Sequence, residues 1–338
     1  MRFFRRGNAG SDGDADFWTW WAGARDRVAM AIADGGFDKA LVDEISRAVQ
    51  GIHPDLAWEL AKGHAAEHAF CVSPEGNAAI RPAALRWLAS APPPDATWEY
   101  HASRQASPLS GAAIEAGGHT FELDAMRAIT SWDEHRQRLD VRLWHDGFAR
   151  APLPVRQQVA FIFLDNALGE DEVERWVGQV DLLDAPSGGR TPDELRAEVV
   201  RHAAEPRGDT WVLGQGADRR GQPVIVMADA GLKRIDHPFA DQHVSIRIRI
   251  DGGGMPDDAL ADTLNREEDR LVGALAGVAT LAARTTTPGE RVIHFVAQDV
   301  DAVRAGIDRW APDAPDWNVK VDFQQDVNWE FQRELGVR

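Results

Sequence analysis

The chain contains very little cysteine and tyrosine. Its 338 residues include one cysteine, Cys71, and one tyrosine, against thirteen tryptophans and thirteen phenylalanines. A single thiol excludes an intrachain disulfide and a cysteine-based metal cluster, and it fits a reducing cytoplasm. Cys71 lies in the apolar run AFCV without a basic neighbour in sequence, so we expect a buried, inert thiol. The tryptophans favour an aromatic core over an aromatic-lined ligand site.

Long hydrophobic runs and positive charge are also scarce. The longest uncharged apolar stretch, residues 271–283, is too short to span a bilayer, and the N-terminus lacks the apolar segment of a secretory signal. The net charge is −17, from 37 Lys and Arg against 54 Asp and Glu. Such a field repels nucleic-acid phosphates and anionic membranes. We therefore expect a soluble, cytoplasmic protein that binds neither nucleic acid nor membranes.

The pattern of apolar residues predicts two domains. We expect a flexible tail at residues 1–15, an N-terminal α+β domain at 16–185, a linker helix at 186–208 and a C-terminal α+β domain at 209–338. Hairpin signals dominate, and the spacing typical of parallel βαβ units is not evident. Each domain is therefore predicted to be an antiparallel sheet with helices packed on one face, ferredoxin-like in style.

Two stretches, residues 160–180 and 292–310, share one pattern. In each, an apolar run predicted to be a strand is followed by an acidic residue and then by an amphipathic helix. We expect each stretch to close its own domain. Neither carries a catalytic signature, and no glycine-rich stretch has the context of a phosphate-binding loop, so we expect no cofactor.

The segment His64-Ala-Ala-Glu67-His68 matches H-x-x-E-H, the inverted form of the zinc hydrolase motif. Zinc chemistry requires both histidines on one helical face, the glutamate as a general base and a third ligand. The apolar residues on either side alternate as they do in strands. We therefore expect the segment to form the tip of a hairpin, where the three side chains do not converge.

A basic surface is predicted on one sheet face of the second half. In the strand VSIRIRI, Ser245, Arg247 and Arg249 lie opposite the apolar row, and Lys320 lies opposite the apolar row of NVKVDF. If these strands pair, their cations form a basic patch on an acidic protein. A solvated sheet face with cross-strand pairs is the alternative interpretation, because one face of an antiparallel sheet is commonly exposed.

Several residues in the second half carry a resemblance to a known family. They are Trp211, the run GQPVIV at 221–226, VSIRIRI, Gly254-Met255-Pro256, Glu268, Gly289, Arg291 and the closing DVNWEF at 326–331. On these residues, the stretch 209–336 resembles the bacterial domain-of-unknown-function family 695. An aromatic residue often ends the strand after the Gly-Arg turn in that family, whereas Ala297 and Gln298 stand there in this chain. The resemblance implies architecture and no chemistry.

The first half resembles a module that is found beside that domain in other bacterial proteins. The residues that carry this likeness are FWTW at 17–20, SPEG at 73–76, Ala91, Pro92 and Trp98, and LDNALGE at 164–170.

Two functions from different classes remain open at this point. The first is a non-catalytic binding or regulatory protein that recognises an acidic protein or a small anionic ligand, as an immunity or inhibitor protein would. Its contacts would come from the sheet face of the second half, with these candidate residues: Arg247, Arg249, Arg291, Lys320 and Trp329. The second is a hydrolase, either zinc-dependent through His64, Glu67 and His68 or built from residues that converge only in three dimensions.

Overall fold

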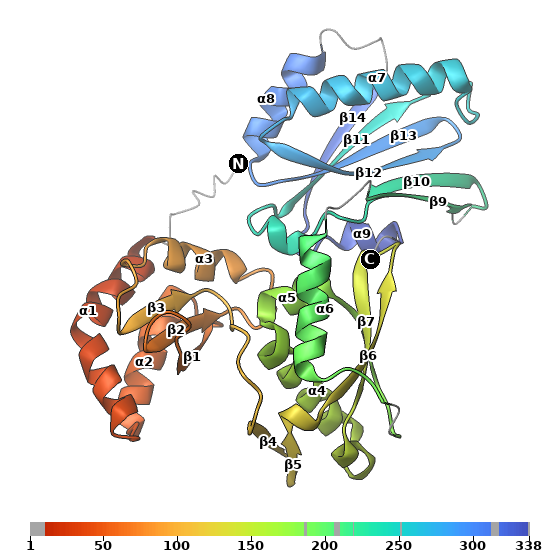
Figure 1. Cartoon of the computed structure of the whole chain (residues 1–338). Helices are drawn as coiled ribbons and strands as arrows, with labels where there is room; N and C mark the ends of the chain where they lie inside the picture. Colours follow the sequence, from red (N-terminus) through yellow and green to blue (C-terminus); the bar gives the residue numbers. More distant parts are fainter. Residues whose placement is uncertain are drawn as a thin grey trace. The chain divides into compact units, whose positions relative to one another are not determined.

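The computed structural model describes residues 11–185, 188–205, 210–218, 220–250, 252–311 and 318–336. The chain divides into two compact units, whose elements are labelled in Figure 1. The first unit comprises Met1–Ser131 and Leu139–Ala204, and the second comprises Trp132–Arg138 and Glu205–Arg338. Both units combine helices with strands, which confirms the α+β class. None of the helices in the described ranges is both long enough and apolar enough to cross a bilayer.

The first unit begins with three helices and a three-stranded sheet. These elements are α1 (Ser11–Ala33), α2 (Lys39–Ile52), β1 (Ala57–Lys62), β2 (His68–Ser73), α3 (Arg81–Ala89) and β3 (Trp98–His101). The strand order is β1-β2-β3. Strands β1 and β2 form an antiparallel hairpin, whereas β2 and β3 are parallel because α3 connects them as a crossover.

Aromatic side chains form the core between these helices and this sheet. Trp21, Trp87 and Trp98 are at most 1% exposed, and the Trp21 indole donates a hydrogen bond to the Tyr100 hydroxyl at 2.9 Å. The predicted tryptophan core is therefore confirmed. Cys71 on β2 is buried as well, and its burial raises the pKa of the thiol, in keeping with the inert role expected from the sequence.

The chain then forms two small sheets, three α-helices and two short 3-10 helices up to Ala204, and the turn Trp132–Arg138 within this stretch is counted with the second compact unit. The strands are β4 (Ala113–Ala116), β5 (His119–Glu122), β6 (Arg127–Asp133), β7 (Arg138–Trp144) and β8 (Val177–Leu182). The helical elements are η1 (Leu123–Ala125), η2 (Asp146–Arg150), α4 (Leu153–Leu168), α5 (Glu170–Trp176) and α6 (Pro192–Ala204). Strands β7 and β8 pair in parallel. The expectation of purely antiparallel sheets is therefore wrong in the first unit, at β2–β3 and at β7–β8.

The predicted strand at the start of residues 160–180 is helical. The apolar run AFIFL belongs to α4, and Gly169, with φ +87° and ψ 148°, separates α4 from α5. Ala160, Phe163 and Leu164 are all buried, and the apolar residues of α4 are not confined to one stripe. The run therefore shows no helical periodicity in the sequence. Short buried runs fit either a strand or a helix. The strand of this region is instead β8, which follows α5.

Two expected boundaries also differ from the structure. Helix α1 begins at Ser11, so the final part of the expected 1–15 tail is helical, and residues 1–10 lie outside the described residues. Helix α6, expected as a linker, is part of the first compact unit. Its Leu195 and Val199 are buried, and the Arg196 guanidinium donates to the carbonyls of Ala167 and Ser107.

The second unit is built on one six-stranded antiparallel sheet. The strands are β9 (Trp211–Ala217), β10 (Pro223–Asp229), β11 (Gln242–Arg249), β12 (Ala279–Thr287), β13 (Glu290–Ala297) and β14 (Val319–Gln325), in the order β14-β11-β13-β12-β10-β9. The helical elements are η3 (Arg234–Asp236), α7 (Asp258–Ala274), α8 (Val300–Trp310) and α9 (Glu330–Glu334). The path β11-α7-β12-β13-α8-β14, with the order β14-β11-β13-β12, is the ferredoxin-like arrangement, extended by the β9–β10 hairpin.

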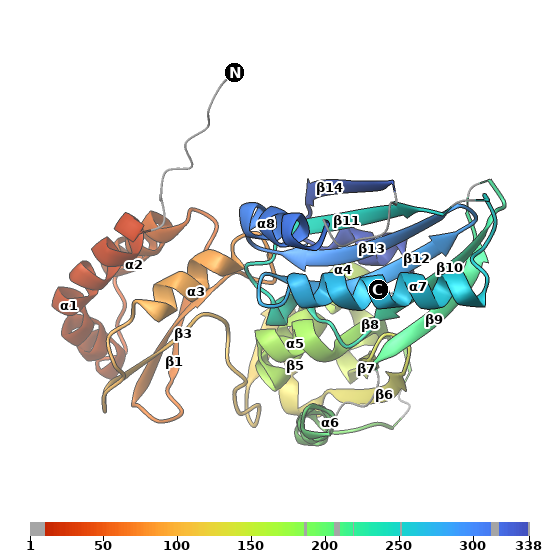
Figure 2. The same cartoon turned by 90° about the horizontal axis from the view of Figure 1, so that it is seen from above.

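Helices α7 and α8 cover one face of this sheet (Figures 1 and 2). The core between them contains Ile246 of β11, Phe295 of β13, Leu271 of α7 and Ile307 of α8. The predicted alternation of VSIRIRI is confirmed, because Val244, Ile246 and Ile248 are fully buried in this core. The odd-numbered residues of β11 therefore face away from the two helices, on what we call the outer face of the sheet.

Part of the outer face is also covered. Leu232, Ala282 and Val296 form a second apolar cluster there with Trp329 and Phe331 from the C-terminal segment. Trp329 has a left-handed backbone, with φ +53°, and directly precedes α9. The outer face is therefore buried where α9 covers it. It is polar at the edge farthest from α9, where β11 ends and β14 begins.

Candidate functional site

Three of the predicted cations meet on the outer face. Arg247 on β11 pairs in register with Lys320 on β14, and Arg249 follows two residues later on the same side of β11. With Glu290 and Asn318, these side chains line a hollow of about 430 Å³, which we call the basic hollow. Three of its five lining residues are cationic and one is anionic. The basic patch predicted from strand alternation is thus present as a concave surface.

The cations of the basic hollow are only partly neutralised. The Arg247 guanidinium contacts Glu290 at 3.1 Å, and Lys320 contacts Asp322 at 3.2 Å. The Arg247 Nε is buried and has no hydrogen-bond partner among the described residues. Arg249 is exposed, and it has no carboxylate partner among the described residues. The hollow therefore retains donors for an oxygen anion.

Arg291, also predicted as a contact, does not reach the basic hollow. It lies on the helix-facing side of β13, is 6% exposed and donates to Asn265 on α7 at 2.8 Å and to Thr286 at 3.2 Å. Strand alternation predicts this placement, because Arg291 points to the same side of β13 as the buried Ile293 and Phe295. Arg291 is therefore a buried structural residue.

Trp329 is also removed from the predicted binding surface. Its side chain is fully buried, and its indole Nε1 donates to the Ala240 carbonyl at 2.8 Å. Asp326 accepts the backbone N–H groups of Glu330 and Phe331, and so caps α9. The DVNWEF segment therefore anchors the C-terminal helix to the outer face.

The H-x-x-E-H segment forms the tip of the β1–β2 hairpin, as expected. Glu99 holds the tip, because its carboxylate accepts the backbone N–H groups of residues 64–66 at 2.8–3.0 Å. Glu67 is exposed, and the His68 ring packs against Trp98 at a centroid distance of 5.1 Å. In the described residues, no group of three or more potential ligands among His, Cys, Asp and Glu could hold a metal ion. The zinc alternative therefore has no supporting geometry.

A histidine pair on the outer face was not predicted. His243 Nε2 and His294 Nδ1 lie 3.0 Å apart, and the Phe331 ring stacks on His243 at a centroid distance of 4.2 Å. Burial lowers the pKa of both imidazoles, that of His294 to about 3. Strand alternation places His294 on this face, but only the tertiary packing of α9 brings Phe331 onto the pair.

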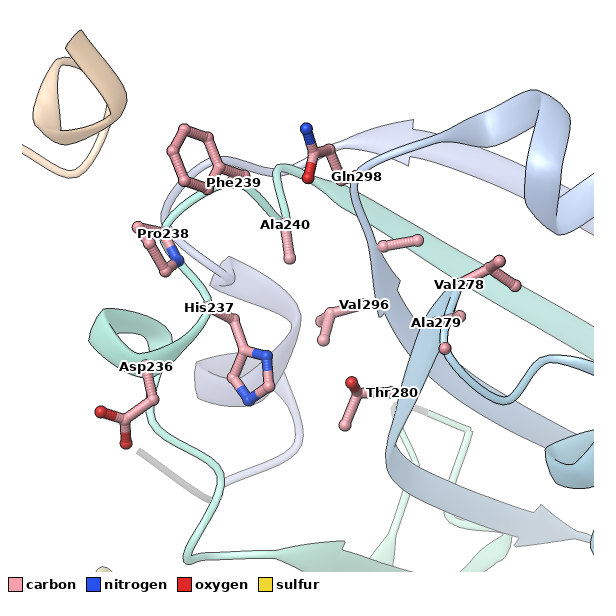
Figure 3. A pocket seen from close by; sticks show the side chains of 12 residues that line it. Asp236, His237, Pro238, Phe239, Ala240, Val278, Ala279, Thr280, Val296 and Gln298 are labelled. Atoms are coloured by element: carbon pink, nitrogen blue, oxygen red, sulfur yellow. The ribbon is translucent and has the colours of Figure 1, made fainter. Parts of the chain in front are cut away.

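A pocket of about 330 Å³ lies at one end of the same sheet (Figure 3). The segment after η3 contributes His237 and Phe239, and the facing strands contribute Thr280 of β12 and Val296 of β13. Burial lowers the pKa of His237, so its imidazole is neutral at pH 7. Sequence reasoning missed this pocket, since its residues come from three separated segments without a recognisable motif.

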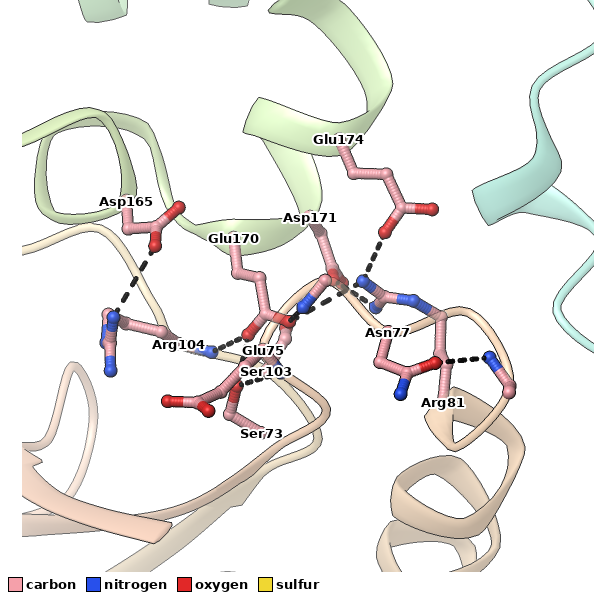
Figure 4. Close-up of polar contacts among 12 residues, drawn as sticks. Ser73, Glu75, Asn77, Arg81, Ser103, Arg104, Asp165, Glu170, Asp171 and Glu174 are labelled. Carbon is pink, nitrogen blue, oxygen red and sulfur yellow. Dashed lines mark hydrogen bonds and ion pairs between the residues drawn. The ribbon is translucent and has the colours of Figure 1, made fainter. Parts of the chain in front are cut away.

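The first unit contains a buried polar cluster that joins two sequence motifs (Figure 4). Glu170, at the start of α5, accepts the Ser73 hydroxyl at 2.6 Å and the Gly76 N–H at 2.8 Å. Arg81, which is 2% exposed, donates to Asp171 and Glu174 at 2.6 Å each. The SPEG and LDNALGE segments thus meet through Glu170.

A second arginine extends this cluster. Arg104 donates to Glu59 at 2.8 Å and contacts Asp165 at 3.5 Å. Burial raises the pKa of Asp165 to about 6, and the neighbouring Glu170 and Glu59 act in the same direction, while Arg104 opposes them. These contacts bind α4 and α5 to the first sheet. We assign the cluster a structural role, because its carboxylates accept hydrogen bonds from the two arginines and from the SPEG segment.

Comparison with known proteins gives one solved structure of low similarity. No curated protein matches the chain. A solved structure described as a conserved hypothetical protein, Aq1575 from Aquifex aeolicus, is 10% identical over 39% of this chain, with a TM-score of 0.14. The match spans 58% of that protein, and a likeness at this level supports no argument about fold or function.

The family comparison concerns the second unit. The model of a "Family of unknown function (DUF695)" matches residues 220–335, which contain both the basic hollow and the pocket. The match does not include the first half, so the preceding module stays a prediction. Residues 220–335 of this chain are thus similar to the family of unknown function DUF695, as the resemblance of the second half predicted.

Proposed function

We propose that the protein is a non-catalytic binding or regulatory protein of the cytoplasm, which recognises anionic oxygen groups through the basic hollow. The observation that carries this proposal is the convergence of Arg247, Arg249 and Lys320 on one concave surface of a protein with a net charge of −17. The ligand group is a carboxylate or phosphate, presented by an acidic protein or by a small molecule.

The strand register supports a functional role for these cations. Arg247 and Lys320 are direct cross-strand neighbours on the outer face. Like charges in this position destabilise a sheet, by about 0.2–1 kcal/mol per pair on the scale of cross-strand interactions. In a chain with more acidic than basic residues, a cluster of cations is less expected by chance. An anion that bridges the two side chains would convert this repulsion into attraction.

The existing ion pairs do not block the hollow. The side chains of Arg247 and Glu290 are 41% and 30% exposed, and Lys320 and Asp322 are more exposed still. Exposed pairs of this kind contribute about 0–1 kcal/mol, so an incoming carboxylate or phosphate displaces them at small cost. The guanidinium of Arg247 can then bind two oxygens of one ligand group.

The experiment compares the wild type with two charge-reversal variants of equal net charge. Arg247→Glu/Arg249→Glu alters the basic hollow, whereas Arg266→Glu/Arg309→Glu alters exposed residues on α7 and α8, on the opposite face. Each variant is titrated with inorganic phosphate and with a hexaglutamate peptide, and binding is followed by calorimetry and NMR. A pull-down from cell extract with mass spectrometry forms a second arm, to distinguish protein partners from small ligands.

We expect saturable binding of at least one probe, or one stoichiometric partner, that is lost in Arg247→Glu/Arg249→Glu and retained in Arg266→Glu/Arg309→Glu. Phosphate binding alone indicates a small anionic ligand, and capture of a partner indicates a protein. If both variants lost binding equally, binding would depend on net charge alone, which would contradict the proposal. Absence of binding in every arm would contradict it too.

A further inference from the structure

We propose that the free edge of β9 binds an extended segment of a partner protein, which adds one antiparallel strand to the sheet of the second unit. In the strand order β14-β11-β13-β12-β10-β9, β9 is the last strand (Figure 1). The basic hollow lies toward the other edge, at β11 and β14. The proposal therefore concerns a second site, whose ligand is recognised mainly by its backbone.

The strand register shows which backbone groups of β9 face the free edge. Just after β9, the Asp218 N–H donates to the Gln222 carbonyl at 2.8 Å, and hydrogen-bonded pairs alternate along an antiparallel ladder. The even-numbered residues of β9 therefore bond to β10, whereas the N–H and C=O groups of Leu213 and Gln215 point outward. Within the described residues, these outward groups have no hydrogen-bond partner.

Strand β9 lacks the features that usually protect the edge of a sheet. Exposed edges are commonly blocked by charged side chains or proline, because unpaired backbone groups attract other strands. The sequence of β9, WVLGQGA, contains neither, and residues 213–217 are all exposed, Leu213 by 60%. The other edge strand, β14, carries Lys320 and Asp322. This difference between the two edges is expected if β9 accepts a further strand.

A cleft of about 720 Å³, which we call the β9 cleft, lies along this edge on the outer face of the sheet. Residues 212–218 line it in succession, together with Val224, Val226 and Ala228 of β10. The turn between β6 and β7, which is counted with the second unit, and the end of α9 supply its other walls. The β9 cleft thus offers apolar contacts to the side chains of a strand paired with β9.

Two glycines of β9 support the same interpretation. Gly214 and Gly216 lie within the strand, where glycine is destabilising and often marks the close approach of another backbone or a ligand. Neither has a positive φ, and a Cβ at Gly216 would meet no atom of the described residues within 4 Å. At Gly214 the nearest atom would be the Val226 Cβ, at 3.9 Å. The fold itself therefore does not require glycine at either position, and the space above them is left for side chains of the added strand.

The β9 cleft and the net charge favour a partner segment over a second copy of this chain. An antiparallel copy of β9 would bring its own Val212, Gly214 and Gly216 to the same face and leave most of the cleft empty. Two chains of net charge −17 also repel each other, whereas a neutral or basic segment does not meet this repulsion. The segment that fits is extended and uncharged or basic, with β-branched or aromatic side chains at the alternate positions that face the cleft.

The test uses the peptide acetyl-KTVTVTK-amide and the full chain. Antiparallel pairing that places the valines in the β9 cleft directs the threonine amides toward the outward groups of Leu213 and Gln215. Binding is measured by calorimetry and by NMR titration, with the backbone amides of these two residues as reporters. We expect saturable binding that is abolished by N-methylation of the central threonine. N-methylation of one valine, whose amide points away from β9, should weaken binding by less than about threefold.

Three variants of the chain locate the binding. Gln215→Pro removes one outward N–H and is tolerated at an edge position, so it should weaken the peptide by about tenfold or more, whereas Gln215→Ala retains this N–H and should bind as the wild type does. Gly216→Val places a side chain in the β9 cleft and should weaken the peptide by about tenfold. The same substitution should leave the midpoint of thermal unfolding unchanged or raised, because valine favours strands. A purely structural role of the glycine would instead lower that midpoint.

Any of four results would overturn the proposal: equal binding of the two N-methylated peptides, undiminished binding to Gln215→Pro, no saturable binding at millimolar peptide, or a wild-type dimer in sedimentation that Gln215→Pro converts to a monomer. The last result would assign the edge to a second copy. Should Gln215→Pro fail to fold, Gly216→Val decides the outcome. Arg247→Glu/Arg249→Glu should not reduce peptide binding, and Gln215→Pro should not reduce phosphate binding, so this test and that of the basic hollow fail separately.

Discussion

At the scale of single residues, Glu268 is a buried charge beneath α7 in the second unit. It is 5% exposed, and its carboxylate accepts the Arg284 guanidinium at 3.0 Å. Its second oxygen is buried without a hydrogen-bond partner among the described residues. Burial raises the pKa of Glu268, and the charges of Arg284 and Arg291 act against that rise. Removal of the carboxylate would leave two arginines under α7 without their counter-charge.

We predict that Glu268→Ala destabilises the second unit by about 3–5 kcal/mol, the usual cost of breaking a buried ion pair. The matched control is Asp269→Ala on the exposed side of α7, which should change stability by less than about 0.5 kcal/mol. Chemical denaturation, with hydrogen exchange of the α7 and β13 peptides, measures the difference. Equal effects of the two substitutions would show that the buried pair is energetically neutral.

Gly169 illustrates a residue whose backbone decides an element boundary. Its φ of +87° with ψ 148° ends α4 and starts α5, a conformation that residues other than glycine rarely adopt. A Cβ at this position would also lie 3.1 Å from the Ala106 nitrogen and 3.3 Å from the Arg104 carbonyl oxygen. Both the backbone angle and the neighbouring backbone therefore select glycine.

Gly169→Ala should accordingly lower the stability of the first unit by about 1–3 kcal/mol. Gly36→Ala is the control, because a Cβ at Gly36 would meet no atom within 4 Å and the backbone there has no positive φ. Thermal unfolding, followed by circular dichroism, provides the measurement. A control variant that loses as much stability as Gly169→Ala would remove the backbone explanation.

At the scale of elements, α9 is held on the sheet by aromatic stacking on histidines whose burial disfavours their charged form. His243 and Phe331 stack with an interplanar angle of 4°, and His294 lies 3.0 Å from His243. The charged groups that act on this pair are Asp326, which raises the pKa of His243, and Arg247, which lowers that of His294. Protonation of either ring would bury a charge, and the loss of its hydration opposes the folded packing of this segment.

The pH dependence follows from the lowered pKa of His294, about 3 against an ordinary 6.5. The folded state holds this imidazole neutral, whereas the unfolded chain binds a proton below pH 6.5. Its contribution to stability is therefore complete above pH 6.5 and is lost as the pH falls toward 3. We expect hydrogen exchange of the 326–336 segment to accelerate between pH 6.5 and 4.5, after correction for intrinsic rates.

The control for this prediction is His243→Gln/His294→Gln, which removes both titrating groups. In this variant, the exchange of α9 should be faster at pH 7.5 and should vary less with pH. An unchanged pH profile would assign the effect to other groups, such as Asp326.

At the scale of the whole molecule, the two units have separate apolar cores. The aromatic core of the first unit contains Phe70 and Trp98, and the ferredoxin-like core of the second contains Ile246 and Phe295. Two cores in one chain need not unfold in one cooperative step. The basic hollow and the pocket beside His237 lie near opposite ends of β13.

We predict two calorimetric transitions for the full chain. Phe70→Ala should destabilise one of them by about 3–5 kcal/mol, as expected for a buried aromatic residue, and leave the other in place. Glu268→Ala should lower the midpoint of the transition of the second unit and leave that of the first unit in place. A single transition that moves equally with either substitution would show that the two units unfold together.

The sequence by itself determined the local features of this protein. The alternation of VSIRIRI and NVKVDF placed Arg247, Arg249 and Lys320 on one face, and the flanking strand signals placed H-x-x-E-H at a hairpin tip. These features depend on neighbours within a few residues. The tertiary structure alone decided that residues 160–168 are helical, that Phe331 stacks on His243, and that His237 faces Thr280. Each of these depends on contacts between distant segments, which a local pattern of polar and apolar residues does not encode.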